Sequence, residues 1–374
     1  CYICKLVQFS QKTPVTEMYG SNYAYKTALS SDMVNHLFAK YKKLIKKLNN
    51  NSCYIADIGS NDGTFLNFFS QRKNTTLFGI DPSAKVFKDN YKKNINIVND
   101  FFSKKNLFSY LNKKKIIKKK FNLITSFAMF YDLEKPNQFC SDISDILDKN
   151  GLWVSEFSYF PLLLKNLTYD QICHEHVAYY TLKTFKNLVN KNNLKIIDYS
   201  INEINGGSIE VVCAKKNSKH KPKSLKIKKI LKDEGKINSK VYERFNNRVK
   251  STKISITNFL KKNKGEVIGY GASTKGNVVL NYCKINSKFL PLICDANKNK
   301  INKFTPGSNI QIISKKKMRQ INPKYLFVLI WPFRSEVIRE EIKFIKSGGK
   351  MIFNLPRFHI VNKFNYKKYL KKSI

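Results

Sequence analysis

Two histidines and a carboxylate stand side by side in the segment Asp170-Gln171-Ile172-Cys173-His174-Glu175-His176. This pattern suits general-base catalysis, because one imidazole can take a proton while the carboxylate fixes its tautomer and favours the cation that forms. In a strand, both rings would share one face and Glu175 the other, whereas a tight turn could bring all three together. A His-x-His metal pair and a solvated loop are the alternatives.

A second candidate site lies in the segment from Tyr54 to Leu66, where an apolar strand runs into a glycine-containing turn and a helix. In a parallel α/β sheet, such a turn lets a ligand approach the backbone at the carboxyl end of the first strand. Acids also follow the next two expected strands, and the first of them suits a ribose diol. Together these features resemble the S-adenosylmethionine (SAM) site of a class I methyltransferase, although ordinary turns could produce the same glycine pattern. The candidate cofactor-binding residues are Asp57, Gly59, Asn61, Asp62, Gly63, Asp81 and Asp100.

Apolar strands alternate with amphipathic helices over the first two thirds of the chain. Strands are expected at 53–58, 77–80, 95–98, 121–126, 151–157, 194–199 and 208–214. Seven strands, of which the last two can form a hairpin, fit an α/β sheet that is mostly parallel with an antiparallel edge. The histidines lie in an insertion of irregular pattern between Phe157 and Tyr180, and catalytic groups are commonly carried by loops on a rigid sheet.

A lysine-rich stretch, 215–264, predicts one or two linking helices before a second α/β unit. That unit begins with the strand 266–270 and the turn from Gly271 to Asn277, and further strands are expected at 289–294, 325–330 and 350–354. Ser273, Thr274 and Lys275 offer hydroxyls, amides and an ammonium to an anion such as a diphosphate. A purely structural turn is the alternative.

The second unit also leaves an oxidoreductase open. Asp295 follows the strand 289–294, where an acid would contact a ribose in a dinucleotide fold, so an NAD-dependent enzyme using the Gly269–Gly271 turn is the runner-up. The third glycine of the dinucleotide fingerprint is missing, which argues against NAD. A non-catalytic sugar-nucleotide binding protein is a further alternative.

Four motifs together resemble those of the SAM-dependent C-methyltransferases that methylate keto-sugars carried by a nucleoside diphosphate. The resemblance spans nearly the whole chain. It implies a zinc-binding N-terminal module, a class I methyltransferase domain and a C-terminal Rossmann-like domain, with expected boundaries at 1–40, 41–216, a helical linker at 217–264, and 265–374. The motifs are Cys1-x-x-Cys4-Lys5-Leu6-Val7-Gln8, Asp57 to Leu66, Tyr169-Asp170-Gln171-Ile172-x-His174-Glu175-His176, and Gly269 to Asn277.

The resemblance implies a role for each candidate residue. His176 matches the last histidine of the family's motif and would remove the proton next to the ketone of a deoxysugar, Glu175 would orient it, and His174 would position the substrate. Tyr25 resembles a tyrosine that the family brings over the active site. This tyrosine would stabilise the oxygen of the enolate. Cys173 stands where many relatives have a second tyrosine, so the second donor to that oxygen is unassigned. The expected substrate-binding residues are Asn205, Gly206, Ser273, Thr274, Lys275 and Asn277.

Cys1 and Cys4 match only the second of the family's two Cys-x-x-Cys pairs, and the chain begins with cysteine rather than methionine. We therefore expect a fragment without the first pair and half of a structural zinc site, because tetrahedral zinc needs four ligands. The remaining cysteines are scattered singly among apolar neighbours, as expected for reduced thiols in a cytoplasmic protein.

Composition excludes several classes of protein. The 374 residues are enough for two core-forming domains, and 42% of them are hydrophobic. The net charge of +43 comes mostly from lysines spread through every expected helix, without a nucleic-acid-binding motif, so we expect no nucleic acid partner. No apolar run reaches the ~18 residues of a membrane span. Without coiled-coil heptads, we expect a monomer.

Overall fold

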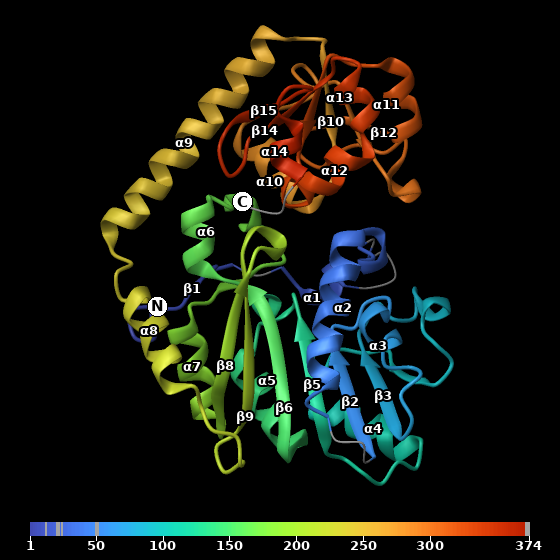
Figure 1. Ribbon diagram of the computed structural model, residues 1–374, viewed down its shortest axis with the longest axis vertical. Coiled ribbons are helices and arrows are strands. Elements are labelled where there is room, and N and C mark those ends of the chain that lie inside the picture. Colours follow the sequence, from blue (N-terminus) through green and yellow to red (C-terminus); the bar gives the residue numbers. More distant parts are fainter. Residues whose placement is uncertain (12, 20–22, 24, 49–51, 371–374) are drawn as a thin grey trace. The chain divides into compact units, whose positions relative to one another are not determined.

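The computed structural model describes residues 1–11, 13–19, 23, 25–48 and 52–370 (Figure 1). The chain divides into two compact units, and each consists of several stretches of sequence. Unit 1 comprises Cys1–Phe160, His174–Asn202 and Ser208–Lys236. Unit 2 comprises Pro161–Cys173, Glu203–Gly207 and Ile237–Ile374.

Unit 1 is built on a seven-stranded sheet with the order β4-β3-β2-β5-β6-β9-β8. Strand β9 runs antiparallel to both of its neighbours, and the other pairings are parallel. This arrangement confirms the predicted α/β sheet with an antiparallel edge. The strands are β2 (Cys53–Ile58), β3 (Thr75–Ile80), β4 (Ile95–Val98), β5 (Phe121–Phe127), β6 (Leu147–Ser158), β8 (Leu194–Asn202) and β9 (Ser208–Lys215).

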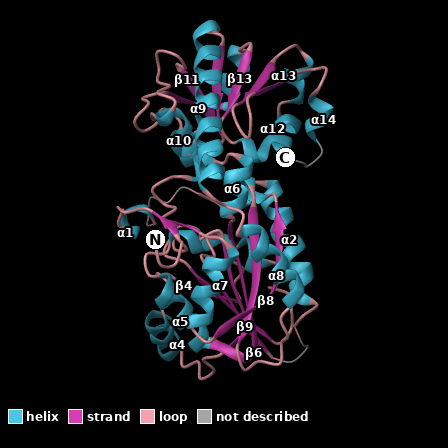
Figure 2. Cartoon of the chain, turned by 90° about the vertical axis from the view of Figure 1, so that its left-hand side faces the viewer, coloured by secondary structure: helices cyan, strands magenta, loops and turns pink. Residues whose placement is uncertain are grey.

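Helices cover both faces of this sheet, because successive strand residues point to opposite faces and both sets are apolar. Val154 of β6 belongs to the same core cluster as Leu37, whereas the neighbouring Trp153 ring contacts Phe139 and Phe185. Figure 2 shows α4, α5 and α7 on one side of the strands and α2 on the other. The helices are α2 (Ser31–Ile45), α3 (Thr64–Asn67), α4 (Lys104–Lys113), α5 (Pro136–Ile146), α7 (Leu182–Lys191) and α8 (Ser224–Glu234).

Shorter elements complete unit 1. A two-residue pairing joins β1 (Val7–Gln8) to β7 (Ala178–Tyr179), directly after the histidine motif. The helix α1 (Val15–Met18) and the single turn η3 (Phe130–Asp132) contribute residues to the site described below.

Unit 2 contains a six-stranded sheet with the order β12-β11-β10-β13-β14-β15. Five strands are parallel and β15 is antiparallel. The sequence predicted the central strands but neither of the two edge strands, β12 and β15, because each of these contains only two adjacent apolar residues. The strands are β10 (Val267–Tyr270), β11 (Leu292–Asp295), β12 (Gln311–Ser314), β13 (Tyr325–Val328), β14 (Lys350–Phe353) and β15 (His359–Val361).

The helices of unit 2 include the predicted linker helix α9 (Ser239–Lys262) and the helix after the glycine-rich turn, α10 (Thr274–Tyr282). The others are α11 (Lys315–Ile321), α12 (Arg334–Glu340), α13 (Ile342–Lys346) and α14 (Tyr366–Leu370). Among the residues that the structure describes, no helix is both long and apolar enough to cross a bilayer.

Two stretches between strands of unit 1 pack with unit 2, a grouping that the sequence did not predict. They contain most of α6 (Phe160–Asn166) and the turns η4 (Tyr169–Gln171) and η5 (Ile204–Gly206). Leu167 and Tyr169 belong to the core of unit 2. The Trp331 indole donates a hydrogen bond of 2.8 Å to Asp170 Oδ2, and Gln171 Nε2 donates one of 2.8 Å to the Asn205 carbonyl. These contacts anchor both stretches in unit 2.

Candidate functional site

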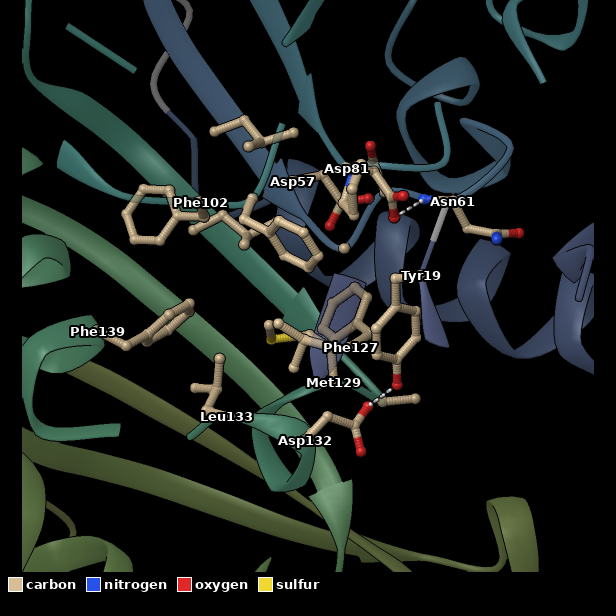
Figure 3. Close-up of a pocket in the computed structure, with 18 of the residues that line it drawn as sticks. Tyr19, Asp57, Asn61, Asp81, Phe102, Phe127, Met129, Asp132, Leu133 and Phe139 are labelled. Carbon is tan, nitrogen blue, oxygen red and sulfur yellow. Dashed lines mark hydrogen bonds between the residues drawn. The ribbon is translucent and has the colours of Figure 1, made fainter. Parts of the chain in front are cut away.

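A cavity of about 430 Å³ lies in unit 1 at the carboxyl ends of β2, β3 and β5 (Figure 3). This is the edge of an open α/β sheet where ligands bind, because the turns after the strands leave room there. Its lining includes five of the predicted cofactor-binding residues: Asp57, Gly59, Asn61, Asp62 and Asp81.

Asp81 fastens the glycine-containing turn after β2 to the end of β3. Its Oδ2 accepts a hydrogen bond of 2.9 Å from the Asn61 amide, and its Oδ1 accepts bonds from the Ser83 amide and hydroxyl at 2.7 and 2.5 Å. An ionised carboxylate has about four acceptor positions. Asp81 can therefore hold the turn and still accept a hydroxyl of a bound ligand.

Asp57, at the end of β2, is 3% exposed. Burial raises the pKa of its carboxyl to about 7, although a hydrogen bond of 2.6 Å from the Thr125 hydroxyl opposes the shift and Asp81 adds to it. Removing a charge from water favours the neutral form. Asp57 is therefore poised to ionise when a cation enters the cavity.

Gly63 and Asp100, the other two predicted cofactor residues, do not line the cavity. Gly63 begins α3 with a φ of +73°, and a Cβ there would lie 2.6 Å from the Tyr91 ring, so this position shapes the turn. The exposed Asp100 turns its carboxylate to the Phe101 amide at 2.7 Å. Instead Phe101 and Phe102 form the wall after β4, and their rings suit the face of a planar base.

The histidine motif forms a turn before β7 and not a strand. His176 is buried, and its ring centroid lies 4.1 Å from that of Tyr131. His174 is exposed and Glu175 is half-buried. Of the two histidines, only His176 is thus shielded from solvent in the way that a tuned base requires.

Glu175 and the cavity are connected through tyrosines. Tyr19 lines the cavity and donates a hydrogen bond of 2.9 Å to Asp132 Oδ2 (Figure 3). Burial, Asp132, Tyr23 and Glu175 all raise the pKa of Tyr19. Burial and Glu175 also raise the pKa of Tyr23, which lines the same cavity. The negative charge of Glu175 therefore contributes to the electrostatic potential at the cavity wall.

Tyr25 also lines the cavity, and its ring centroid lies 6.4 Å from that of Tyr23. Its side chain is 47% exposed. The backbone around it is fixed from the glycine turn, because Asn61 Nδ2 donates to the Tyr25 carbonyl at 3.1 Å. Tyr25 is part of the segment Asn22-Tyr23-Ala24-Tyr25, of which Asn22 and Ala24 lie outside the described residues.

The cavity is acidic in a protein that is strongly basic. Its described lining carries the acids Asp57, Asp62, Asp81, Asp132, Glu134 and Asp142 against the base Lys135. Over the whole sequence, Lys and Arg outnumber Asp and Glu by 69 to 26. This reversal of charge gives the cavity a potential that favours a cationic ligand.

The predicted substrate-binding residues all lie in unit 2. Ser273 caps α10, because its hydroxyl accepts from the Gly276 amide at 3.0 Å, while Thr274 is exposed. Asn205 has the left-handed φ of 55°, and the Gly206 carbonyl accepts from Asn166 Nδ2 at 2.9 Å.

The remaining two of these residues, Lys275 and Asn277, follow Thr274 in α10. Asp170, in η4, is 1% exposed, and burial raises its pKa to about 6 against the opposing effects of Lys275 and Trp331. Lys275 therefore faces an acid as well as the expected anion. The Asn277 Oδ1 is buried without a hydrogen bond among the described residues.

Asp295, the acid that left a dinucleotide site open, is engaged by backbone groups. Its two carboxylate oxygens accept from the amides of Ala272 and Asn297, each at 2.8 Å. Lys300 lies 4.0 Å from the same carboxylate and donates to the Ala272 carbonyl at 2.8 Å. These contacts give Asp295 a structural role in the turn.

Cys1 and Cys4 are both exposed at the beginning of the chain. The other cysteines are buried, as expected. Two thiolates supply half of a tetrahedral zinc set, so a structural zinc ion remains a prediction.

Sequence reasoning missed Tyr19, Tyr131, Asp132 and the phenylalanine wall. A signal was present for Asp132, because it comes after the fourth predicted strand as Asp81 and Asp100 come after the second and third. For Tyr19 there was none, since it lies in an irregular segment far from the sheet in sequence.

Comparison with known proteins supports a methyltransferase fold. Residues 32–199 match the family described as "Methyltransferase domain", and residues 203–356 match "C-methyltransferase C-terminal domain". The C-methyltransferase NovU of Streptomyces niveus is 23% identical over 368 residues, which cover 97% of this chain and 86% of that protein.

Solved structures also resemble part of the chain. A magnesium protoporphyrin IX methyltransferase from Synechocystis with bound SAM aligns with 49% of this chain and 79% of its own, at 10% identity and a TM-score of 0.36. A protein from Pyrococcus horikoshii aligns with 51% of this chain and 94% of its own, at 15% identity and a TM-score of 0.38.

Proposed function

Because the chain belongs to the SAM-dependent C-methyltransferases, we propose that it methylates the carbon next to the ketone of a nucleoside-diphosphate keto-sugar. Such a carbon is acidic enough for an enzymatic base to remove its proton, and the resulting enolate is a carbon nucleophile. Bound SAM supplies an electrophilic methyl group on a positively charged sulfur.

The acid-lined cavity is the observation that carries this proposal. Its charge opposes that of the rest of the chain and suits a ligand with a sulfonium and an ammonium group. Asp81 can accept a ribose hydroxyl, and Phe101 and Phe102 can cover an adenine face. Asp57 can lie near a positive group of the ligand. The residues present therefore fit SAM.

His176 is the proposed general base. The ring of His176 is buried against that of Tyr131, and Asp132, the next residue in the chain, lies on the cavity wall. His176 would therefore remove a proton from a substrate carbon that lies close to the cofactor. Glu175, directly beside it in the chain, would stabilise the imidazolium that forms, and the exposed His174 would contact the sugar. Tyr25 would close the cavity and donate to the enolate oxygen.

The nucleotide would bind unit 2 through Ser273, Thr274, Lys275 and Asn277 at the beginning of α10. A helix N-terminus with an ammonium group in its first turn attracts a diphosphate. Asn205 and Gly206 are proposed to border the same ligand.

The first experiment is calorimetric titration of the purified chain with S-adenosylhomocysteine (SAH) and, separately, with NAD. We expect binding of SAH alone, and binding of NAD alone would replace the proposal by an oxidoreductase. Incubation with SAM and a panel of nucleotide keto-sugars should then give a product heavier by one methylene group, detected by mass spectrometry.

His176→Asn tests the base. We expect the variant to bind SAH as the unaltered protein does and to lose turnover by the ~10²- to 10⁴-fold typical of a missing general base. His220→Asn, at a half-buried position away from the motif, is the matched control. Full activity of His176→Asn would rule out His176 as the base.

A further inference from the structure

Tyr19 and Asp132 form a hydrogen-bonded pair on the cavity wall, drawn from segments 113 residues apart in the sequence. Neither residue has a part in the mechanism above. We propose that this pair recognises the sulfonium charge of the cofactor, so that the protein distinguishes SAM from its neutral product SAH. The inference rests on the proposed SAM site and adds specificity to it.

The hydrogen bond decides what Tyr19 can offer to a ligand. A phenol hydroxyl has one hydrogen, and in this structure Tyr19 donates it to Asp132 Oδ2 at 2.9 Å. The oxygen of Tyr19 is therefore left with lone pairs and no donor. Because the carboxylate polarises the O–H bond, these lone pairs carry more negative charge than those of an isolated phenol.

The position of the pair along the cavity points to the sulfonium end of the cofactor. The sheet order β4-β3-β2-β5 places the phenylalanine wall after β4 and the ribose acceptor Asp81 after β3 at one end. Asp132 follows β5 at the other end. In Figure 3, Tyr19 and Asp132 lie together with Met129, while Asp57 and Asp81 are grouped elsewhere in the cavity.

The surroundings of Tyr19 increase its preference for a cation. Burial is the main cause of the raised pKa of Tyr19, and Asp132, Tyr23 and Glu175 add to it, so the ring stays a neutral phenol in a region of negative potential that a positive partner would relieve. A sulfonium would supply that partner, whereas the neutral thioether of SAH would not. Methyl transfer thus removes the attraction and favours exchange of the spent cofactor.

The test compares SAM and SAH affinities by isothermal titration calorimetry in the full chain. For Asp132→Asn we expect SAM to bind ~10-fold or more weakly, the scale of one charge-assisted contact, with SAH within about twofold of the unaltered protein. Tyr19→Phe should weaken SAM selectively as well, by a smaller factor because Asp132 remains. A merely structural role would weaken both compounds alike.

Two controls separate the pair from diffuse effects. Asp89→Asn removes one negative charge at an exposed site, and Tyr110→Phe removes a phenol from α4. Neither residue lines the cavity, and neither change should alter the ratio of SAM affinity to SAH affinity.

A nitrogen analogue of SAM, with a methylated tertiary amine in place of the sulfonium, separates the effect of the charge from that of the methyl group. Its preference for the unaltered protein over Asp132→Asn should appear only at pH values where the amine is protonated.

Equal weakening of SAM and SAH in Asp132→Asn, or an unchanged ratio, would overturn the inference and leave the SAM site intact. Failure of the unaltered protein to bind either compound would refute the cofactor site itself, and the proposed role of the pair with it. The two failures are therefore distinguishable.

Discussion

At the scale of single residues, the acids at the strand ends do different work although they occupy equivalent places. Asp81 is held by three hydrogen bonds from the backbone and Ser83, whereas Asp57 is buried with its pKa raised to about 7. Asp100 is exposed and caps its own turn. Burial and local donors, and not residue type, determine which acid can respond to a cation.

The raised pKa of Asp57 predicts a pH-dependent affinity for SAM. The unliganded protein holds a proton on Asp57 below pH ~7, and a cationic ligand favours the ionised form, so binding releases that proton. The affinity should rise by up to about tenfold per pH unit below 7 and level off above it. Calorimetry in two buffers of different ionisation enthalpy measures the proton released.

Asp57→Asn is the control for this prediction. It cannot ionise, so proton release and the pH dependence between 6 and 7.5 should disappear while a weaker affinity remains. Proton release of the same size from Asp57→Asn would assign the effect to another group.

At the scale of elements, α2 is fastened to the antiparallel edge of the sheet by buried charges. Lys40 forms ion pairs with Glu156 of β6, at 2.6 Å, and with Glu210 of β9, and His36 contacts Glu156 at 2.9 Å. The same helix supplies Met33 and Leu37 to the cavity wall. The ionic cluster therefore sets the position of one wall of the cofactor site.

Removal of Lys40 should be costly. Lys40→Met leaves the buried Glu156 and the half-buried Glu210 without their cation, for which we expect a loss of about 3–5 kcal/mol in the free energy of unfolding, measured by urea denaturation at pH 7. Lys43→Met, at an exposed position on the same helix, should change stability by no more than about 0.5 kcal/mol. A loss of stability in Lys40→Met no larger than that in Lys43→Met would contradict the stabilising role of the ionic cluster.

The cluster also predicts acid sensitivity. Burial alone would raise the pKa of Glu156, but Lys40 and His36 outweigh it and lower the pKa from 4.5 to about 2. A lowered carboxyl pKa gives stability that is present above the unfolded value and is lost as pH falls from ~4.5 toward 2. Glu156→Gln should flatten that part of the stability curve.

At the scale of the whole molecule, the two units are interwoven along the chain. The stretches 161–173 and 203–207 leave the first unit, pack in the second and return, and His174, Glu175 and His176 follow immediately after the first of them. The Asp170–Trp331 hydrogen bond is one of the polar anchors of that stretch, beside the bonds from Arg248 and Asn354. The integrity of unit 2 therefore bears on the segment that leads to His176.

Trp331→Phe tests this anchor. It leaves the buried Asp170 without its indole donor, and we expect a loss of about 1–3 kcal/mol in stability, followed by circular dichroism during denaturation. Asp170→Asn keeps the shape and removes the charge, so it should cost less. SAH affinity should stay within about twofold in both, because the cavity lies in unit 1; a large loss would show that the anchor supports the cofactor site as well.

Most of the fold could be predicted from the sequence, because buried strands and turn glycines are local signals. Strands such as 53–58 and 95–98 end where periodicity and the following acids indicate. The edge strands β12 and β15 could not be found in this way, because each contains only two adjacent apolar residues. Within the site, Asp57 and Asp81 were identifiable because one lies at the end of an apolar strand and the other directly follows one.

The sequence by itself determined the class of sheet, the glycine turn and the candidate base, since each depends on residues close together in the chain. Only the tertiary structure decided that Tyr19 meets Asp132, that the ring of His176 lies against Tyr131, and that the stretches 161–173 and 203–207 join the second unit. These contacts join residues 45 to more than 100 positions apart, and such pairings depend on which apolar surfaces are buried together. No local pattern encodes that choice, because every long-range contact depends on the packing of the whole sheet.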